Sequence, residues 1–285
     1  MTKQLSSMTV PQYENRRLFY IIFSWLLASV ALGFAALPLI ALHLLYLLNK
    51  GYIIYGFIGL IFIIILSDSR HPVLSFASNL KTIIVLLLTL FLLKGGVGQF
   101  RVTFYSRWYV YFLPFILFAV FCIIYSPVQL TAFQKTLSYL LLIVITPTLF
   151  YALYNHYRVN FLRTLILSGA AVLVAGFMLY IINPALVMYN YGSRSSGAFG
   201  NPNALGIFSF LFFILFFVVR QYFPHVFTKR ETLIIYALII ASLLWSGSRG
   251  QTLSVLIFLA TQVLSKRNKI VGLFLVATGG LFLMF

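Results

Sequence analysis

Acidic side chains are almost absent from this sequence. Asp and Glu together number 3 in 285 residues, against 20 Lys and Arg, and the formal charge at pH 7 is +17. The acids are Glu14, Asp68 and Glu231, and each lies near a charged end or in a loop between apolar runs. Carriers driven by protons or sodium ions use carboxylates within the membrane. The sequence therefore argues against ion-coupled transport.

Cysteine and metal-binding patterns are also missing. Cys122 is the single cysteine and falls within an apolar run, which excludes an intramolecular disulfide and a cysteine-rich metal site. The sequence contains no P-loop and no pair of His residues at metal-ligand spacing. We therefore expect no metal and no other cofactor.

Long polar segments are absent as well, and hydrophobic residues dominate. They make up 62% of the chain, charged residues make up 8%, and the mean hydropathy is +1.04. A soluble domain has about a quarter charged residues, so we expect one integral membrane domain over residues 1–285. The basic residues form short clusters between apolar runs, which is typical of membrane topology and of attraction to anionic lipids rather than of nucleic-acid binding.

Apolar runs predict an all-α bundle of transmembrane helices. The first run, Leu18–Leu48, is about 31 residues, or roughly 46 Å as a helix against a bilayer core of about 30 Å. Its Gly33 and Pro38 allow either a kinked helix or a two-helix hairpin. Further spans are expected near residues 52–66, 82–93, 108–126, 137–154, 162–182, 204–222, 232–246, 251–264 and 270–285.

Basic loops predict the orientation of these spans. Lys and Arg gather between alternate spans, and Arg16 and Arg17 precede the first one, so we expect the N-terminus and these loops in the cytoplasm. With the N-terminus in the cytoplasm, this orientation requires an even number of crossings before Asn49, which favours the hairpin and gives about eleven spans in total. The outer loops are then residues 67–81, 127–136, 184–203 and 246–250.

One polar stretch, SSGAFGNPNALG at residues 195–206, stands out among the apolar runs. Asn201 followed by Pro202 predicts the start of a helix, because Asn caps free N–H groups and Pro at the first helical position loses no hydrogen bond. Gly197 and Gly200 allow tight turns or the close approach of another chain or a ligand. The same loop brings Arg194 to the outer surface.

A second stretch, LLWSGSRGQTLSVL, has the same design. We expect a span to end at Trp245, the chain to turn through residues 246–250 with Arg249 in the turn, and a helix to begin on the outer side. Two arginines and two helix N-termini on one face suit the headgroup of a phosphate-bearing lipid. Interface anchoring of both arginines and simple capping by Asn201 explain the same residues without a ligand.

The motif RSSGAFGNPNALG is followed, after one span, a basic loop and a second span, by the motif WSGSRG. This pair resembles the paired signature of the O-antigen ligase and polymerase family over residues 190–265. This resemblance implies a bacterial glycosyltransferase that works without metal at the periplasmic face of the inner membrane. It implies a polyprenyl diphosphate-linked glycan as donor. The acceptor is lipid A core or a growing polysaccharide, and nothing in the sequence separates ligase from polymerase.

The resemblance also implies roles for six residues. Arg194 and Arg249 would bind the diphosphate and stabilise its charge as it leaves, and Asn201, Asn203, Ser248 and Gly250 would support substrate binding. Members of the family carry a large outer loop with a His that helps to activate the acceptor. We expect that part of the fold beyond Phe285.

Two other functions account for the same composition. A flippase or transporter of an anionic lipid-linked saccharide also has many apolar spans and a few cations, although the sequence has no internal repeat. A purely structural membrane subunit is the third possibility.

Overall fold

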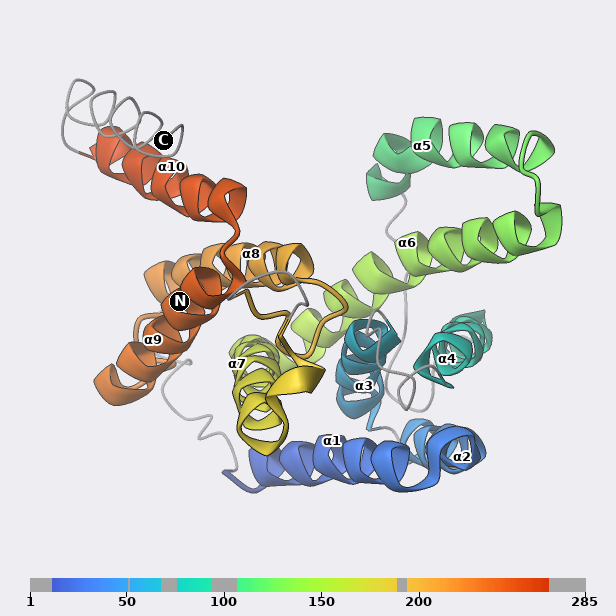
Figure 1. Ribbon diagram of the computed structural model, residues 1–285, viewed down its shortest axis with the longest axis horizontal. Helices are drawn as coiled ribbons and strands as arrows, with labels where there is room; N and C mark the ends of the chain where they lie inside the picture. Colours follow the sequence, from blue (N-terminus) through green and yellow to red (C-terminus); the bar gives the residue numbers. More distant parts are fainter. Residues whose placement is uncertain (1–11, 51, 68–75, 94–106, 189–193, 267–285) are drawn as a thin grey trace. The chain divides into compact units, whose positions relative to one another are not determined.

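The computed structural model describes residues 12–50, 52–67, 76–93, 107–188 and 194–266 (Figure 1). These ranges are almost entirely helical, and their only β-type pairing is one isolated bridge. The chain divides into two compact units, unit 1 with Met1–Ser67 and Val73–Phe161, and unit 2 with Asp68–Pro72 and Leu162–Phe285. The predicted all-α class is confirmed.

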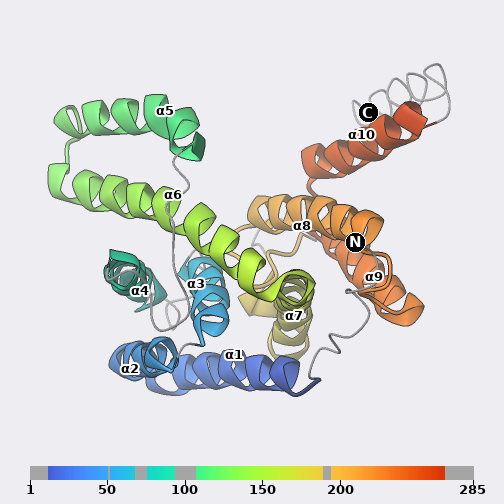
Figure 2. The same cartoon turned by 180° about the vertical axis from the view of Figure 1, so that it is seen from behind.

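Unit 1 is built around one nearly enclosed helix. Its elements are α1 (Gln12–Leu32), the 3-10 turn η1 (Gly33–Ala35), α2 (Ala36–Asn49), α3 (Ile53–Ser67), α4 (Phe76–Leu93), α5 (Arg107–Ile124) and α6 (Gln129–Tyr157). Residues 53–60 of α3 are all buried, and α3 packs against α2 and α4. Figures 1 and 2 both show α5 and α6 side by side.

The first long apolar run is divided into α1 and α2 by the 3-10 turn η1, and its reading as a hairpin of two spans stays a prediction. The break lies at Gly33, whose φ of +54° is in the left-handed region that favours glycine. Pro38 lies in the first turn of α2, where a missing N–H leaves no helical hydrogen bond unmade. The glycine therefore makes the break, and the proline follows it.

Two of the expected outer loops are partly helical. α4 begins at Phe76 and α6 begins at Gln129, so residues 76–81 and 129–136 are helical rather than loop. The sequence-based boundaries were wrong there because polar residues such as Gln129 and Lys81 lower the hydropathy without breaking a helix. The expected span at 270–285 lies outside the described residues.

Among the described residues, three helices are long and apolar enough to cross a membrane: α6, α7 (Val159–Ile182) and α8 (Pro202–Tyr222). By length and composition they indicate a membrane protein. The eleven spans, the cytoplasmic N-terminus and the single membrane domain stay predictions.

Unit 2 carries both sequence motifs. It contains α7 from Leu162 onward, the 3-10 turn η3 (Pro184–Leu186), α8, α9 (Lys229–Ser246) and α10 (Arg249–Lys266). α8 packs against both α9 and α10 (Figure 1). Small residues allow close packing with α7, because a Cβ at Gly176 would lie 3.1 Å from the Gly197 Cα. The polar loop before α8 thus lies directly against α7.

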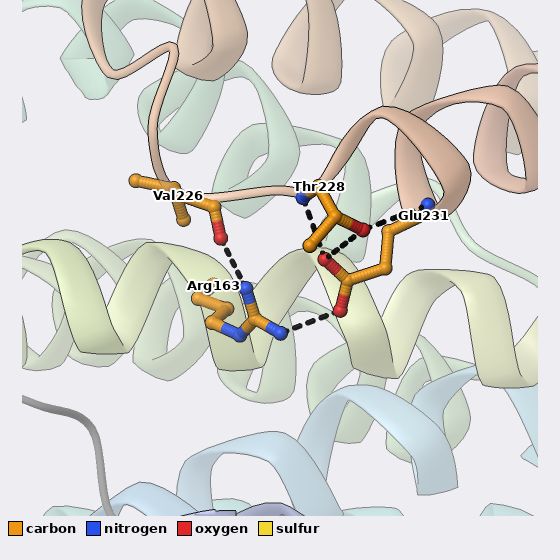
Figure 3. A network of polar contacts seen from close by, with 4 residues as sticks. All are labelled: Arg163, Val226, Thr228 and Glu231. Carbon is orange, nitrogen blue, oxygen red and sulfur yellow. Dashed lines mark hydrogen bonds and ion pairs between the residues drawn. The ribbon is translucent and has the colours of Figure 1, made fainter.

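A polar network fastens the α8–α9 loop to α7 (Figure 3). Arg163 of α7 donates hydrogen bonds to the Val226 carbonyl and, at 2.6 Å, to a Glu231 carboxylate oxygen. Thr228 and Glu231 form a capping box at the start of α9. Burial raises the pKa of Glu231, but the hydrogen bonds from Thr228 and the charge of Arg163 outweigh it and hold that pKa below its ordinary value.

Candidate functional site

The NPN motif begins α8, as the sequence predicts. Asn201 is the N-cap, and its side-chain oxygen accepts a hydrogen bond from the Ala204 N–H at 2.8 Å. Pro202 is the first helical residue and is buried. Asn203 follows it in the first turn and is exposed. The motif therefore turns the chain into the helix and places one amide, that of Asn203, at the surface.

The SGSRG motif links α9 to α10 through two residues. α9 ends at Ser246, Gly247 adopts the left-handed conformation with φ 59° and ψ 25°, and α10 begins at Arg249. Arg249 and Gly250 are thus in the first turn of α10, and the prediction that places Arg249 in a turn was wrong. The left-handed residue is the reason, because one glycine at the helix end stops α9 and redirects the chain within a two-residue link.

Backbone hydrogen bonds tie the loop before α8 to the end of α9. The Ser195 N–H donates to the Trp245 carbonyl at 2.9 Å, and Ser195 also forms an antiparallel bridge with Met188. The Ser196 N–H donates to the Val187 carbonyl at 2.7 Å. Ser195 and Ser196 are both buried. Backbone hydrogen bonds therefore hold the loop that carries Arg194 to the end of α9 and to Val187.

Arg194 connects the two motifs. Its Nε donates to the Ser246 carbonyl at 2.8 Å, and its Nη2 donates to the Asn203 side-chain oxygen at 2.8 Å. Ser246 is at the end of α9, where carbonyls lack helical partners, and Asn203 is in the first turn of α8. One side chain thus joins the C-terminal end of α9 to the N-terminal end of α8.

Glycines let these elements approach closely. A Cβ at Gly206 of α8 would lie 2.6 Å from the Ser248 Cβ, which is closer than real Cβ atoms come. Ser248 is buried, its N–H donates to the Ser246 hydroxyl at 3.2 Å, and its own hydroxyl donates to Gln251. Ser248 therefore supports the link and the first turn of α10 from within.

The structure brings all six predicted site residues to one end of unit 2, through hydrogen bonds, close packing and adjacency in the chain: Arg194, Asn201, Asn203, Ser248, Arg249 and Gly250. Arg249 is exposed, and a Cβ at the adjacent Gly250 would meet nothing within 4 Å. The Asn201 side-chain oxygen already accepts the capping hydrogen bond from Ala204. The acid and the histidine of the described part of unit 2, Glu231 and His225, lie at the other end of α9 or in the loop before it.

No family model, curated protein or solved structure matches this chain. The resemblance to the glycan transferases therefore rests on the residues of the two motifs.

Sequence reasoning missed two residues of this arrangement. Gly247 packs against the Arg194 side chain, and the Ser246 carbonyl accepts from it. The position of Gly247 directly after an apolar helix is a signal for a left-handed helix end. The use of a main-chain carbonyl by Arg194 has no sequence signal.

A capping role for Asn201 makes a simple prediction. Asn201→Ala removes the acceptor for the Ala204 N–H and is expected to lower the free energy of unfolding by about 1 kcal/mol. Asn201→Asp keeps an acceptor and should stay within about 0.5 kcal/mol of the parent. Reversible unfolding in mixed detergent and SDS micelles measures both. An alanine variant of parental stability that had lost ligand binding would instead make Asn201 a ligand contact.

Proposed function

We propose that this end of unit 2 binds the diphosphate of a polyprenyl-linked glycan and supports transfer of the glycan to lipid A core or to a growing polysaccharide. The proposed place is the periplasmic face of a bacterial inner membrane. The observation that carries the proposal is the position of Arg194. Its side chain is hydrogen-bonded to Asn203 in the first turn of α8 and to the Ser246 carbonyl, and it packs against Gly247, which lies two residues before Arg249.

The electrostatics of the first turns support binding of an anion. The N-termini of α8 and α10 carry partial positive charge, and the Asn201 cap leaves other N–H groups of α8 without helical partners. Arg249 adds a full charge in the first turn of α10 and is exposed. Arginine suits phosphate oxygens because its planar group can donate two parallel hydrogen bonds.

The proposed reaction is a substitution at the sugar. The oxygen of an acceptor hydroxyl bonds to the anomeric carbon of the donor, the bond from that carbon to the diphosphate oxygen breaks, and its electron pair stays on the diphosphate. Arg194 and Arg249 stabilise this growing negative charge. The hydroxyl proton ends on the released diphosphate, directly or through water, and Glu231 and His225 take no part because they lie at the other end of α9 or in the loop before it.

Helix capping is the competing role for Arg194. A cation that donates to the last carbonyl of α9 stabilises the helix end with or without a ligand. Arg249 separates the two roles because it is exposed and its side chain has no hydrogen bond to the described residues. Its replacement removes charge without removing a helix cap.

The test compares Arg249→Ala with Arg230→Ala, a matched loss of one charge near the opposite end of α9. The probe is undecaprenyl diphosphate in lipid nanodiscs at 0.15 M salt, where exposed charges more than about 8 Å apart are largely screened. We expect Arg249→Ala to weaken saturable binding about tenfold and Arg230→Ala to leave it unchanged.

Equal losses in both variants would show attraction to net charge alone, and would count against the site. In a second assay, sealed vesicles receive the donor linked to a glycan. Release of glycan-free undecaprenyl diphosphate supports transfer, whereas movement of an intact donor across the vesicle membrane supports transport.

A further inference from the structure

We propose that Gly247 and Asn203 are positioning residues that fix the guanidinium of Arg194, so that its Nη1–Nη2 end can take a phosphate by two parallel hydrogen bonds. This inference rests on the proposed function and extends it to how the phosphate is held. Asn203 then acts through Arg194 rather than as a direct substrate ligand.

The hydrogen bonds of Arg194 occupy one edge of its guanidinium. A guanidinium has five N–H groups in a fixed plane. The Nε–H and the Nη2–H on the same edge point toward the Ser246 carbonyl and the Asn203 oxygen. The two Nη1–H groups and the second Nη2–H have no acceptor among the described residues. One Nη1–H and the second Nη2–H point in parallel from the end of the fork, which matches two oxygens of one phosphate.

The absence of a side chain at Gly247 leaves room for the Arg194 side chain. A Cβ at Gly247 would lie 3.0 Å from the Arg194 Cγ, 3.1 Å from Nε and 3.3 Å from Cδ. The φ of +59° at this position is also unfavourable for a residue with a Cβ. A methyl group here would displace Nε, which is the atom that donates to the adjacent Ser246 carbonyl.

Asn203 fixes the other end of the same edge. Its oxygen lies 2.8 Å from Nη2, and the residue is exposed in the first turn of α8. With the Ser246 carbonyl it gives the guanidinium two fixed acceptors, which set the direction of the plane. Loss of either acceptor leaves rotation about the remaining hydrogen bond, and rotations of about 10–20° already impair a preorganised site.

The experiment measures binding of undecaprenyl diphosphate in nanodiscs by the full chain and four variants. Gly247→Ala and Asn203→Leu are expected to weaken binding about tenfold, and Arg194→Ala at least as much. Gly33→Ala is the matched control, because Gly33 has a φ of +54° but a Cβ there meets nothing within 4 Å. It bears similar backbone strain without touching Arg194 and should bind as the parent does.

A second readout follows Arg194 itself, without ligand. Hydrogen exchange of the Arg194 Nε–H, in protein labelled with nitrogen-15 at arginine and assigned by Arg194→Lys, should be slow in the parent and faster in Gly247→Ala and Asn203→Leu. Asn203→Asp keeps an oxygen acceptor and should retain slow exchange. If Gly247 and Asn203 contributed to stability alone, Asn203→Asp would not restore slow exchange of the Arg194 Nε–H.

The possible results separate the positioning role of Gly247 and Asn203 from the proposed function. Parental binding and slow exchange in Asn203→Leu, which changes an exposed residue, would overturn the positioning role even if Gly247→Ala did not fold. Loss of binding in Arg194→Ala alone would keep the proposed function and reject this inference. Equal binding by Arg194→Ala and the parent would reject the proposed function and the inference together.

Discussion

Replacement of Arg194 by alanine is expected to lower the rate of glycan transfer about a hundredfold, since the loss of one well-placed donor to a developing oxyanion has a cost of that order. Under the proposed function, the variant removes charge where a leaving diphosphate would gain it, and it removes the fork that would bind two phosphate oxygens. Arg194→Lys keeps the charge but has no planar fork, so it should recover only part of the rate.

The measurement is the release of glycan-free undecaprenyl diphosphate from a glycan-loaded donor, followed by mass spectrometry in isolated membranes. Arg230→Ala is the control for the loss of charge, because Arg230 is exposed in the first turn of α9, away from Ser246. A full rate in Arg194→Ala would reduce the arginine to a cap of α9. A lysine variant as active as the parent would reject recognition by the fork.

The second large effect is expected on stability. Arg163→Met keeps the apolar stem but removes the donors to the Val226 carbonyl and to Glu231 (Figure 3). The side chains of Arg163 and Glu231 are 21% and 31% exposed, so water weakens the pair but does not replace it. Because the carboxylate and the carbonyl lose a charged partner, we expect the free energy of unfolding to fall by about 2 kcal/mol.

Unfolding in mixed micelles measures this effect, with Arg230→Met as its control. Arg230 lies next to Glu231 in sequence and is exposed, so the same exchange should change stability by about 0.5 kcal/mol or less. Similar losses in both variants would mean that net charge, rather than the network, is responsible.

The same network predicts a dependence on pH. The folded protein holds the pKa of Glu231 below its ordinary value of 4.5, so the folded state favours the charged form. The stabilisation is complete above pH 4.5 and is lost as the pH falls through the lower, folded pKa. The stability difference between the parent and Glu231→Gln should therefore be constant at neutral pH and shrink in acid. A constant difference down to pH 2 would contradict it.

Local rules explain which parts of the fold the sequence predicted. Asn201 and Pro202 mark the start of α8 because the cap and the missing N–H act within one turn. Gly33 lies at the break in the first apolar run for an equally local reason. The starts of α4 and α6 were misplaced because hydropathy reports where a helix meets lipid, while the backbone continues through polar residues such as Gln129.

The candidate site depends more on tertiary contacts. The sequence pointed to Arg194 and Asn203 as two ligands of a substrate, whereas the structure joins them by a hydrogen bond. It also places Ser248 inside, against Gly206, with its hydroxyl bonded to Gln251. The Ser248–Gln251 hydrogen bond is local, but the other contacts join the polar loop to α8 and the α9–α10 link to α8, and no spacing in the chain encodes their distances.

The sequence by itself determined the helical class, the abundance of apolar helices and the polar motifs that begin α8 and end α9, because capping, hydropathy and glycine conformation act over a few neighbouring residues. Only the tertiary structure decided that Arg194 reaches the Ser246 carbonyl, 52 positions away in the chain. That contact depends on how α8, α9 and the polar loop pack, and on Gly247 leaving space for the arginine stem. Packing is set by the sum of many distant contacts, and so it becomes visible only in the folded chain.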